Sequence, residues 1–185
     1  MTATIAVPMR VIVFDGHQDT ADSAALLFKW WGHHAHSVYA SQAAFERAFD
    51  IKPDLMLIDL VQREPESLEL ADRLRRQAGL EALQLVALSD QDDVAQWRRA
   101  KSAGFADYLV KPVPATEFLR VLLNARAAIA RSIDRSVRSS EMAARAISRN
   151  GAARAGLQFT HDALQSTRDV LHRLNGDRNG SLGDY

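Results

Sequence analysis

Residues 55–60 read LMLIDL, an uninterrupted apolar run that the carboxylate of Asp59 closes. Two further runs have the same character, VIVF at 11–14 and LVAL at 85–88. Strands that are apolar along their whole length are typical of a parallel sheet covered by helices on both faces. The segments that we expect to form strands are 10–14, 36–39, 55–58, 84–88 and 107–110.

Longer segments of helical character separate these runs, and the alternation predicts crossover helices that join parallel strands. Helices are expected near 19–31, 41–49, 66–78 and 92–103, and a fifth begins at Ala115. Gly32, Gly79 and Gly104 follow three of these segments, at positions where glycine commonly ends a helix. The predicted fold class is therefore α/β, a doubly wound five-stranded parallel sheet with flanking helices.

The chain continues well beyond the fifth predicted strand. Apolar residues recur there about every four or seven positions, which predicts that the fifth helix extends into the 130s. Leucines spaced by seven in 157–171 predict a further helix. We therefore expect a main domain at 8–123, a helical extension at 124–174 and a flexible tail at 175–185. The apolar positions in the fifth helix are Phe118, Leu122, Ile129, Ile133 and Val137.

Charge is zero in total but uneven along the chain. Residues 1–119 hold 12 Lys and Arg against 17 Asp and Glu, whereas residues 120–185 hold 11 Arg against 6 Asp and Glu. The acidic part, residues 1–119, could attract divalent cations. The basic part, residues 120–185, could bind an acidic partner or nucleic acid, or it could form a solvated helix face. The absence of cysteine excludes disulfides and thiolate sites. No apolar run approaches the roughly 20 residues of a spanning helix, so we expect a cytoplasmic protein without a membrane partner.

Polar side chains close four of the expected strands. They are Asp15, Asp59, Ser89 and Lys111. In a doubly wound sheet the carboxyl ends of the strands share one rim, where ligands bind. Two carboxylates, a hydroxyl and a lysine at that rim suit phosphoryl transfer.

Each of these groups has a role in that chemistry. Asp59 is already ionised, so it can attack phosphorus without a general base and form an aspartyl phosphate. Asp15 can help to hold Mg²⁺, which takes oxygen ligands and neutralises charge on phosphoryl oxygens. Ser89 can donate a hydrogen bond to one phosphoryl oxygen, and Lys111 can place its ammonium on another.

Four segments resemble the successive signatures of the bacterial two-component response-regulator receiver family: VIVFDGHQDTADS (11–23), LMLIDL (55–60), VALSD (86–90) and GFADYLVKP (104–112). The resemblance covers about residues 8–123. It implies a flavodoxin-like fold with strand order 2-1-3-4-5 and phosphorylation of Asp59 by a histidine kinase or a phosphotransfer protein. The chain would then be a signalling switch and not an enzyme, apart from catalysing its own phosphorylation.

The resemblance also implies how the switch works. Ser89 would move toward the phosphoryl group and Tyr108 would turn inward, altering the face made by the fourth and fifth helices and the fifth strand. With the C-terminal extension, this face would bind a second copy of the chain or a protein target. Lys111-Pro112 matches a Lys-Pro whose bond is cis in the family, a form that only X-Pro bonds adopt at modest energetic cost.

The sequence departs from the family pattern at two places. The first strand normally ends with two adjacent acids, whereas Gly16 follows Asp15 here, and the loss of a close charge should weaken Mg²⁺ binding. The segment 61–67, VQREPES, stands where the family usually has a proline and later a glycine. The backbone carbonyl of Val61 should still serve as a metal ligand, and Pro65 is expected to reshape the loop.

Several alternatives accompany this interpretation. Gly16 would be consistent with a pseudo-receiver, a protein-interaction or dimerisation module that works without phosphorylation. DNA binding by 124–185 is disfavoured, because the segment has few aromatic residues and no clear helix-turn-helix signature. A zinc site at the histidines of 33–36 is disfavoured because no further ligand set is visible. Trp97 on the expected fourth helix would suit a partner contact if its indole is exposed.

Overall fold

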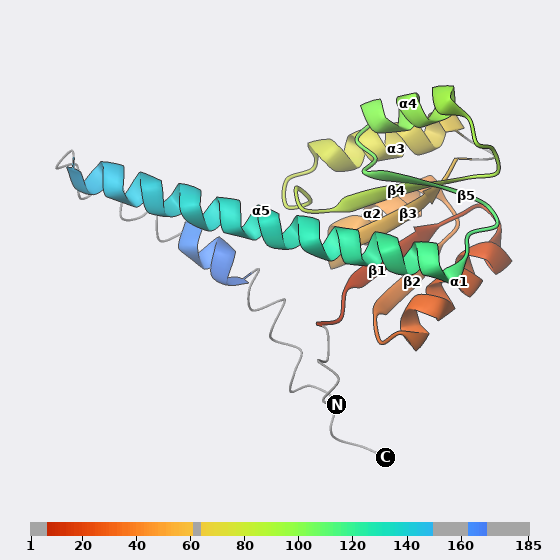
Figure 1. The fold of residues 1–185 in the computed structure, drawn as a ribbon, viewed down its shortest axis with the longest axis horizontal. Coiled ribbons are helices and arrows are strands. Elements are labelled where there is room, and N and C mark those ends of the chain that lie inside the picture. Colours follow the sequence, from red (N-terminus) through yellow and green to blue (C-terminus); the bar gives the residue numbers. More distant parts are fainter. Residues whose placement is uncertain (1–6, 61–63, 150–162, 170–185) are drawn as a thin grey trace, which may run out of the picture. The chain divides into compact units, whose positions relative to one another are not determined.

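The computed structural model describes residues 7–60, 64–149 and 163–169. It contains one five-stranded parallel sheet in the order β2-β1-β3-β4-β5, with helices on both faces (Figure 1). The predicted fold class, the strand order and the helical continuation after the sheet are confirmed. The strands are β1 (Arg10–Phe14), β2 (His34–Val38), β3 (Leu55–Asp59), β4 (Gln84–Ser89) and β5 (Asp107–Val110). The helices are α1 (Gln18–Trp30), α2 (Ser41–Ile51), α3 (Glu64–Arg76), α4 (Val94–Ser102) and α5 (Ala115–Arg149).

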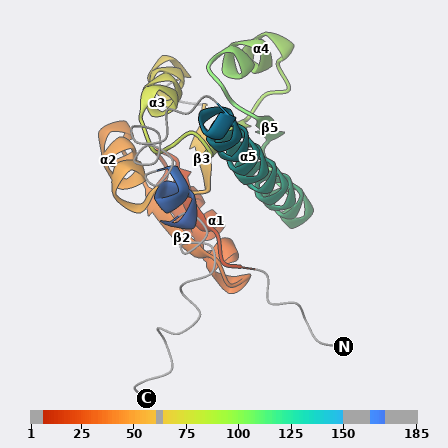
Figure 2. The same cartoon turned by 90° about the vertical axis from the view of Figure 1, so that its left-hand side faces the viewer.

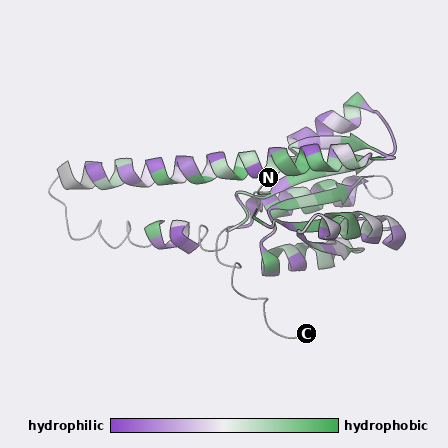
Figure 3. Cartoon of the chain, turned by 60° about the horizontal axis from the view of Figure 1, so that its bottom comes forward, coloured by the Kyte–Doolittle hydropathy of each residue, from purple (hydrophilic) through white to green (hydrophobic). Residues whose placement is uncertain are grey.

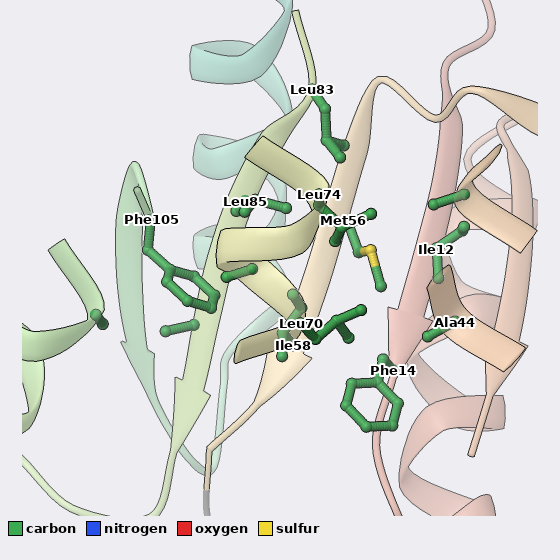
Figure 4. Close-up of a cluster of buried hydrophobic side chains, with 14 of the residues drawn as sticks. Ile12, Phe14, Ala44, Met56, Ile58, Leu70, Leu74, Leu83, Leu85 and Phe105 are labelled. Carbon is green, nitrogen blue, oxygen red and sulfur yellow. The ribbon is translucent and has the colours of Figure 1, made fainter. Parts of the chain in front are cut away.

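Alternate residues of the central strands supply the core on one face of the sheet. Ile12, Met56 and Leu85 belong to one buried cluster with apolar side chains of α2, α3 and α4 (Figure 4). Helices α2 and α3 lie side by side over this face (Figure 2). Because each fully buried aliphatic side chain contributes about 1.5–3 kcal/mol, this cluster is a main source of stability.

The opposite face is covered by α1 and by the first half of α5. The rings of Phe28 and Phe118 meet edge to face there, with centroids 5.6 Å apart. Val11 and Val13, which alternate with the residues of the first cluster, are also fully buried. The central strands β1, β3 and β4 therefore bury apolar side chains on both faces, and green residues run through the sheet in Figure 3.

Predicted and observed elements differ at their ends. Strand β2 begins at His34, two residues earlier than expected, and α3 begins at Glu64 instead of residue 66. Pro65 consequently lies in the first turn of α3 and not in the loop where it was expected, and residues 61–63 of that loop lie outside the described residues. Proline is well accommodated there because the first N–H groups of a helix have no partner within the helix.

The chain divides into two compact units, and the sheet belongs to the unit Pro8–Ile129. The other unit includes the second half of α5 and the helical residues 163–169. Helix α5 continues to Arg149, so the predicted extension of the fifth helix is confirmed and is longer than expected. Leu164 is exposed in the helix at 163–169, whereas Leu157, Leu171 and the predicted tail at 175–185 lie outside the described residues. Within the described ranges, no helix combines the length and the apolar character that crossing a membrane requires.

Candidate functional site

The carboxyl ends of three strands bring two carboxylates and one ammonium group together. Asp15 follows β1, Asp59 ends β3 and Lys111 follows β5. The Nζ of Lys111 donates to Asp15 Oδ2 and to Asp59 Oδ1, each at 2.8 Å. These contacts join residues 96 and 52 positions apart, so the arrangement depends on the folded sheet.

Both carboxylates are shielded from water and are paired. Asp15 is 0% exposed and Asp59 is 6% exposed. A buried carboxylate is unfavourable unless a cation or hydrogen-bond donors compensate it, and Lys111 supplies both. Burial opposes the charge of Lys111, but the hydrogen bonds and charges of Asp15 and Asp59 prevail and raise the pKa of Lys111. Lys111 therefore keeps its positive charge at neutral pH, in contact with both carboxylates.

Helix α3 holds the backbone of Asp59. The hydroxyl of Ser67, which is buried in α3, donates to the carbonyl oxygen of Asp59 at 2.7 Å. On the other side of the peptide, the N–H of Leu60 donates to the carbonyl of Leu88 at 2.8 Å. The sequence analysis missed Ser67, although it lies in the segment 61–67 that departs from the family pattern, and this departure was a usable signal.

A cavity of about 240 Å³ lies beside Asp59. Of the four predicted strand-end residues only Asp59 lines this cavity, and Asp15, Ser89 and Lys111 are not part of its wall. Gly16 is one of its walls and contributes no side chain, so the second acid of the family pattern is replaced by open space. The cavity is lined by Phe14, Gly16, Tyr39, Ala40, Ser41, Asp59, Glu66 and Ser67.

The predicted switch residues meet at a third side chain. Ser89 ends β4 and is buried, and its hydroxyl donates to Gln96 Oε1 at 2.5 Å. The hydroxyl of Tyr108 lies 2.6 Å from the same oxygen and 2.7 Å from the carbonyl oxygen of Gln91. Gln96 was not among the predicted residues, because the sequence does not show which face of α4 turns toward β4.

The remaining predicted residues have separate places. The Lys111-Pro112 bond is cis. Val61 lies outside the described residues, so its carbonyl stays a prediction. Trp97 is half-buried, with its ring 5.7 Å from that of Tyr108, so only part of its indole is exposed for a partner contact.

His33 precedes strand β2 and His36 lies within it, and both side chains contact other parts of the domain. Nδ1 of His33 accepts the backbone N–H of Met9 at 3.2 Å. His36 lies 3.1 Å from a guanidinium nitrogen of Arg47. In the part of the chain that the structure describes, no three His, Cys, Asp or Glu side chains gather as a ready-made metal site.

The family model described as "Response regulator receiver domain" matches residues 11–123. The chain belongs to this family. Receiver domains are signalling modules of two-component systems.

Relatives of this receiver agree with the assignment. The chain is 26% identical over 117 residues to Protein RcaC of Microchaete diplosiphon, covering 63% of the chain but only 18% of that protein. It is similar in structure to the chemotaxis protein CheY4 of Vibrio cholerae, with a TM-score of 0.60 and 16% identity over 64% of this chain and 98% of that one. A response regulator from Thermotoga maritima gives a TM-score of 0.58 and 24% identity over 64% and 97% of the two chains. These structural similarities show the fold.

Receiver domains generally bind Mg²⁺, and the donor set of this one fits such an ion with few protein ligands. Mg²⁺ is usually held by one or two carboxylates and keeps several waters or phosphate oxygens. Asp15 and Asp59 provide two carboxylates, and the cavity beside Asp59 leaves room for waters. Gly16 provides none, so the set is smaller than the family pattern.

Proposed function

We propose that this receiver accepts a phosphoryl group on Asp59 from a histidine kinase or a phosphotransfer protein and acts as a cytoplasmic switch in bacterial two-component signalling. The observation that carries the proposal is the position of the Lys111 ammonium, 2.8 Å from a carboxylate oxygen of both Asp15 and Asp59. A cation beside a buried nucleophilic carboxylate, next to a cavity, suits an incoming phosphoryl group.

The chemistry follows from the charges of these residues. An oxygen of Asp59 forms a bond to phosphorus while the bond from phosphorus to the donor nitrogen of a phosphohistidine breaks. The imidazole leaves with the electron pair and takes up a proton from solvent. Lys111 stabilises the charge on the transferred oxygens, and Ser89 donates a hydrogen bond to one of them.

Magnesium would be held by Asp15, Asp59 and the backbone carbonyl of Val61. When bound, the ion would neutralise charge on the phosphoryl oxygens. Gly16 removes one acidic ligand, so we expect weaker binding than a site with three carboxylates would have.

The output would be a change in the face formed by α4, β5 and α5. Phosphorylation draws Ser89 and Tyr108 inward in this proposal and alters the contacts of α4. Apolar side chains exposed on these three elements support a protein contact, either a homodimer or another protein, to which the extension of α5 would contribute. They are Val94, Val110, Leu119 and Leu123.

The test is phosphorylation by a small donor. The full chain is incubated with acetyl phosphate, with and without Mg²⁺, and its intact mass is measured. We expect a gain of one phosphoryl group that requires Mg²⁺ and is absent from Asp59→Asn. A Gly16→Asp variant, which restores the second acid, should reach the same occupancy at a lower Mg²⁺ concentration.

A second candidate function is the pseudo-receiver, an interaction module that needs no phosphorylation. Gly16 favours it, because the site lacks the second acid of the family pattern. A folded chain that gains no mass even at millimolar acetyl phosphate would support this function and contradict phosphorylation.

A further inference from the structure

Gln96 of α4 has a fixed amide orientation that its three partners impose. Its Nε2 donates to Glu64 Oε2 at 3.0 Å, and an ionised carboxylate can only accept. The amide nitrogen must therefore face Glu64, and Oε1 must face the hydroxyls of Ser89 and Tyr108. Ser89 therefore donates to Gln96 Oε1, whereas the single hydroxyl hydrogen of Tyr108 has two acceptors within reach, Gln96 Oε1 and the carbonyl oxygen of Gln91.

Glu64 is itself held by a cation on α4. Arg99 Nε donates to Glu64 Oε1 at 2.5 Å, and a second guanidinium nitrogen lies 3.3 Å from Oε2. The hydrogen bond from Arg99 is the main cause that lowers the pKa of Glu64, so this carboxylate stays ionised at neutral pH. Glu64 is the first residue of α3, five positions after Asp59, and its contacts join the start of α3 to α4.

The hydroxyl of Ser89 has one hydrogen, and Gln96 receives it. The other contact of the Ser89 oxygen is the N–H of Gln91 at 3.2 Å, for which the oxygen is the acceptor. Ser89 cannot donate to a phosphoryl oxygen on Asp59 until the bond to Gln96 breaks.

We propose that Gln96 is the positioning residue of this switch, which withholds the Ser89 hydroxyl from Asp59 until the phosphoryl group arrives, with Glu64 and Arg99 fixing its orientation. The proposal rests on the function proposed above. On phosphorylation, Ser89 exchanges its acceptor Gln96 Oε1 for a phosphoryl oxygen, and Gln96 loses its contact with Ser89. The hydrogen bond between Ser89 and Gln96 therefore determines how strongly phosphorylation of Asp59 is coupled to a rearrangement of α4.

The test uses Gln96→Met in the full chain, because methionine has a similar volume and only a weak acceptor. The measured quantity is the ratio of chain phosphorylated on Asp59 to unmodified chain, at limiting acetyl phosphate with Mg²⁺. We expect this ratio to rise about two- to tenfold in Gln96→Met, which corresponds to the loss of one neutral hydrogen bond. Gln84→Met, which removes a glutamine at the opposite end of β4, is the matched control and should leave the ratio unchanged.

A double-mutant cycle separates positioning from a general structural effect. If Gln96 acts through Ser89, then Gln96→Met has no effect on the ratio in a Ser89→Ala background. An unchanged ratio in Gln96→Met, or an effect of equal size in that background, would overturn the proposal. Should Gln96→Met fail to fold, Glu64→Gln loosens the same amide from its carboxylate and is expected to act in the same direction.

Failure of phosphorylation itself has a separate signature. If the wild-type chain gains no phosphoryl group, the proposed function fails, and the hydrogen bonds of Gln96 are then read from the indole N–H resonance of Trp97, assigned with Trp97→Phe. Because Trp97 packs on Tyr108, we expect that resonance to shift in Gln96→Met and not in Gln84→Met. An unmoved resonance would overturn the role of Gln96 independently.

Discussion

Ser67 donates its hydroxyl hydrogen to the carbonyl oxygen of Asp59 across 2.7 Å, and both residues are buried. The bond ties the strand that carries the proposed phosphoacceptor to the helix that follows it. Because a buried carbonyl left without a donor is unfavourable, this contact contributes to the stability of the site as well as to its geometry.

Replacing Ser67 tests that contact. We expect Ser67→Ala to lower the free energy of unfolding by about 1 kcal/mol, the net contribution of a buried hydrogen bond. Urea denaturation measures the change. The control is Ser102→Ala, since the Ser102 hydroxyl bonds the carbonyl of Arg98 on the exposed side of α4 and should be close to neutral. Equal effects of the two substitutions would contradict the special role of Ser67.

Removing the cation at the rim should destabilise the domain in a pH-dependent way. Lys111→Met leaves two buried carboxylates without their partner, and we expect a loss of roughly 1.5–3 kcal/mol at neutral pH. Asp15 and Asp59 raise the pKa of Lys111 above its ordinary 10.5 in the folded state, despite the opposing effect of burial. The stabilisation is therefore complete below pH 10.5 and is lost as the pH rises through the folded-state pKa.

The measurement compares unfolding free energies of the wild type and Lys111→Met from neutral pH to above pH 10.5. The difference between the two unfolding free energies should be constant near neutral pH and should decrease at alkaline pH. Lys101→Met, at an exposed lysine of α4, is the control and should show no such difference. A difference that grows with alkaline pH would contradict the pairing.

Alanine substitutions at Gly32 and Gly104 can separate the effect of backbone strain from that of a steric clash. Gly32 and Gly104 have φ of 84° and 95°, but only at Gly104 would a Cβ meet a neighbour, 2.8 Å from Nε of Arg75. Gly32→Ala should lose about 1 kcal/mol from backbone strain alone. Gly104→Ala should lose more, because Arg75 must also give up its bonds to the carbonyls of Gly104 and Leu83. Thermal unfolding of the two variants checks the order, and equal losses would refute the collision.

The first half of α5 should behave as part of the receiver core. Phe118 is buried against Phe28, so Phe118→Ala should lower the free energy of unfolding by about 3–5 kcal/mol. Leu123 is 56% exposed on the same helix, and Leu123→Ala should change it by less than about 1 kcal/mol. A small effect of Phe118→Ala in chemical denaturation would show that α5 is docked more loosely than the structure has it.

The sheet could be predicted because its information is local. Continuous apolar runs such as 55–58 identify central strands, and the strand ends then place Asp15, Asp59 and Lys111 at one rim. Strand β2 was misplaced at its start because its sequence, HAHSV, is largely polar and is only partly buried. Pro65 was assigned to a loop because the start of a helix and a turn both favour proline.

The contacts that tune the site could not be predicted in the same way. Ser67, Glu64 and Gln96 act through the rotation of α3 and α4 about their axes, which depends on how the helices pack on the sheet. A glutamine on a short polar helix such as α4 has no sequence pattern that separates an inward position from an exposed one. Only the folded arrangement shows that Gln96 joins Ser89 to Tyr108.

The most direct test of the central claim is to locate the modified residue. The full chain is treated with acetyl phosphate and Mg²⁺, digested and mapped by tandem mass spectrometry. The account predicts a hydroxylamine-sensitive phosphoryl group on the peptide that contains Asp59, and none in Asp59→Asn or, at the same donor concentration, far less in Lys111→Met. A phosphoryl group on another residue, or none on a chain that circular dichroism shows to be folded, would contradict it.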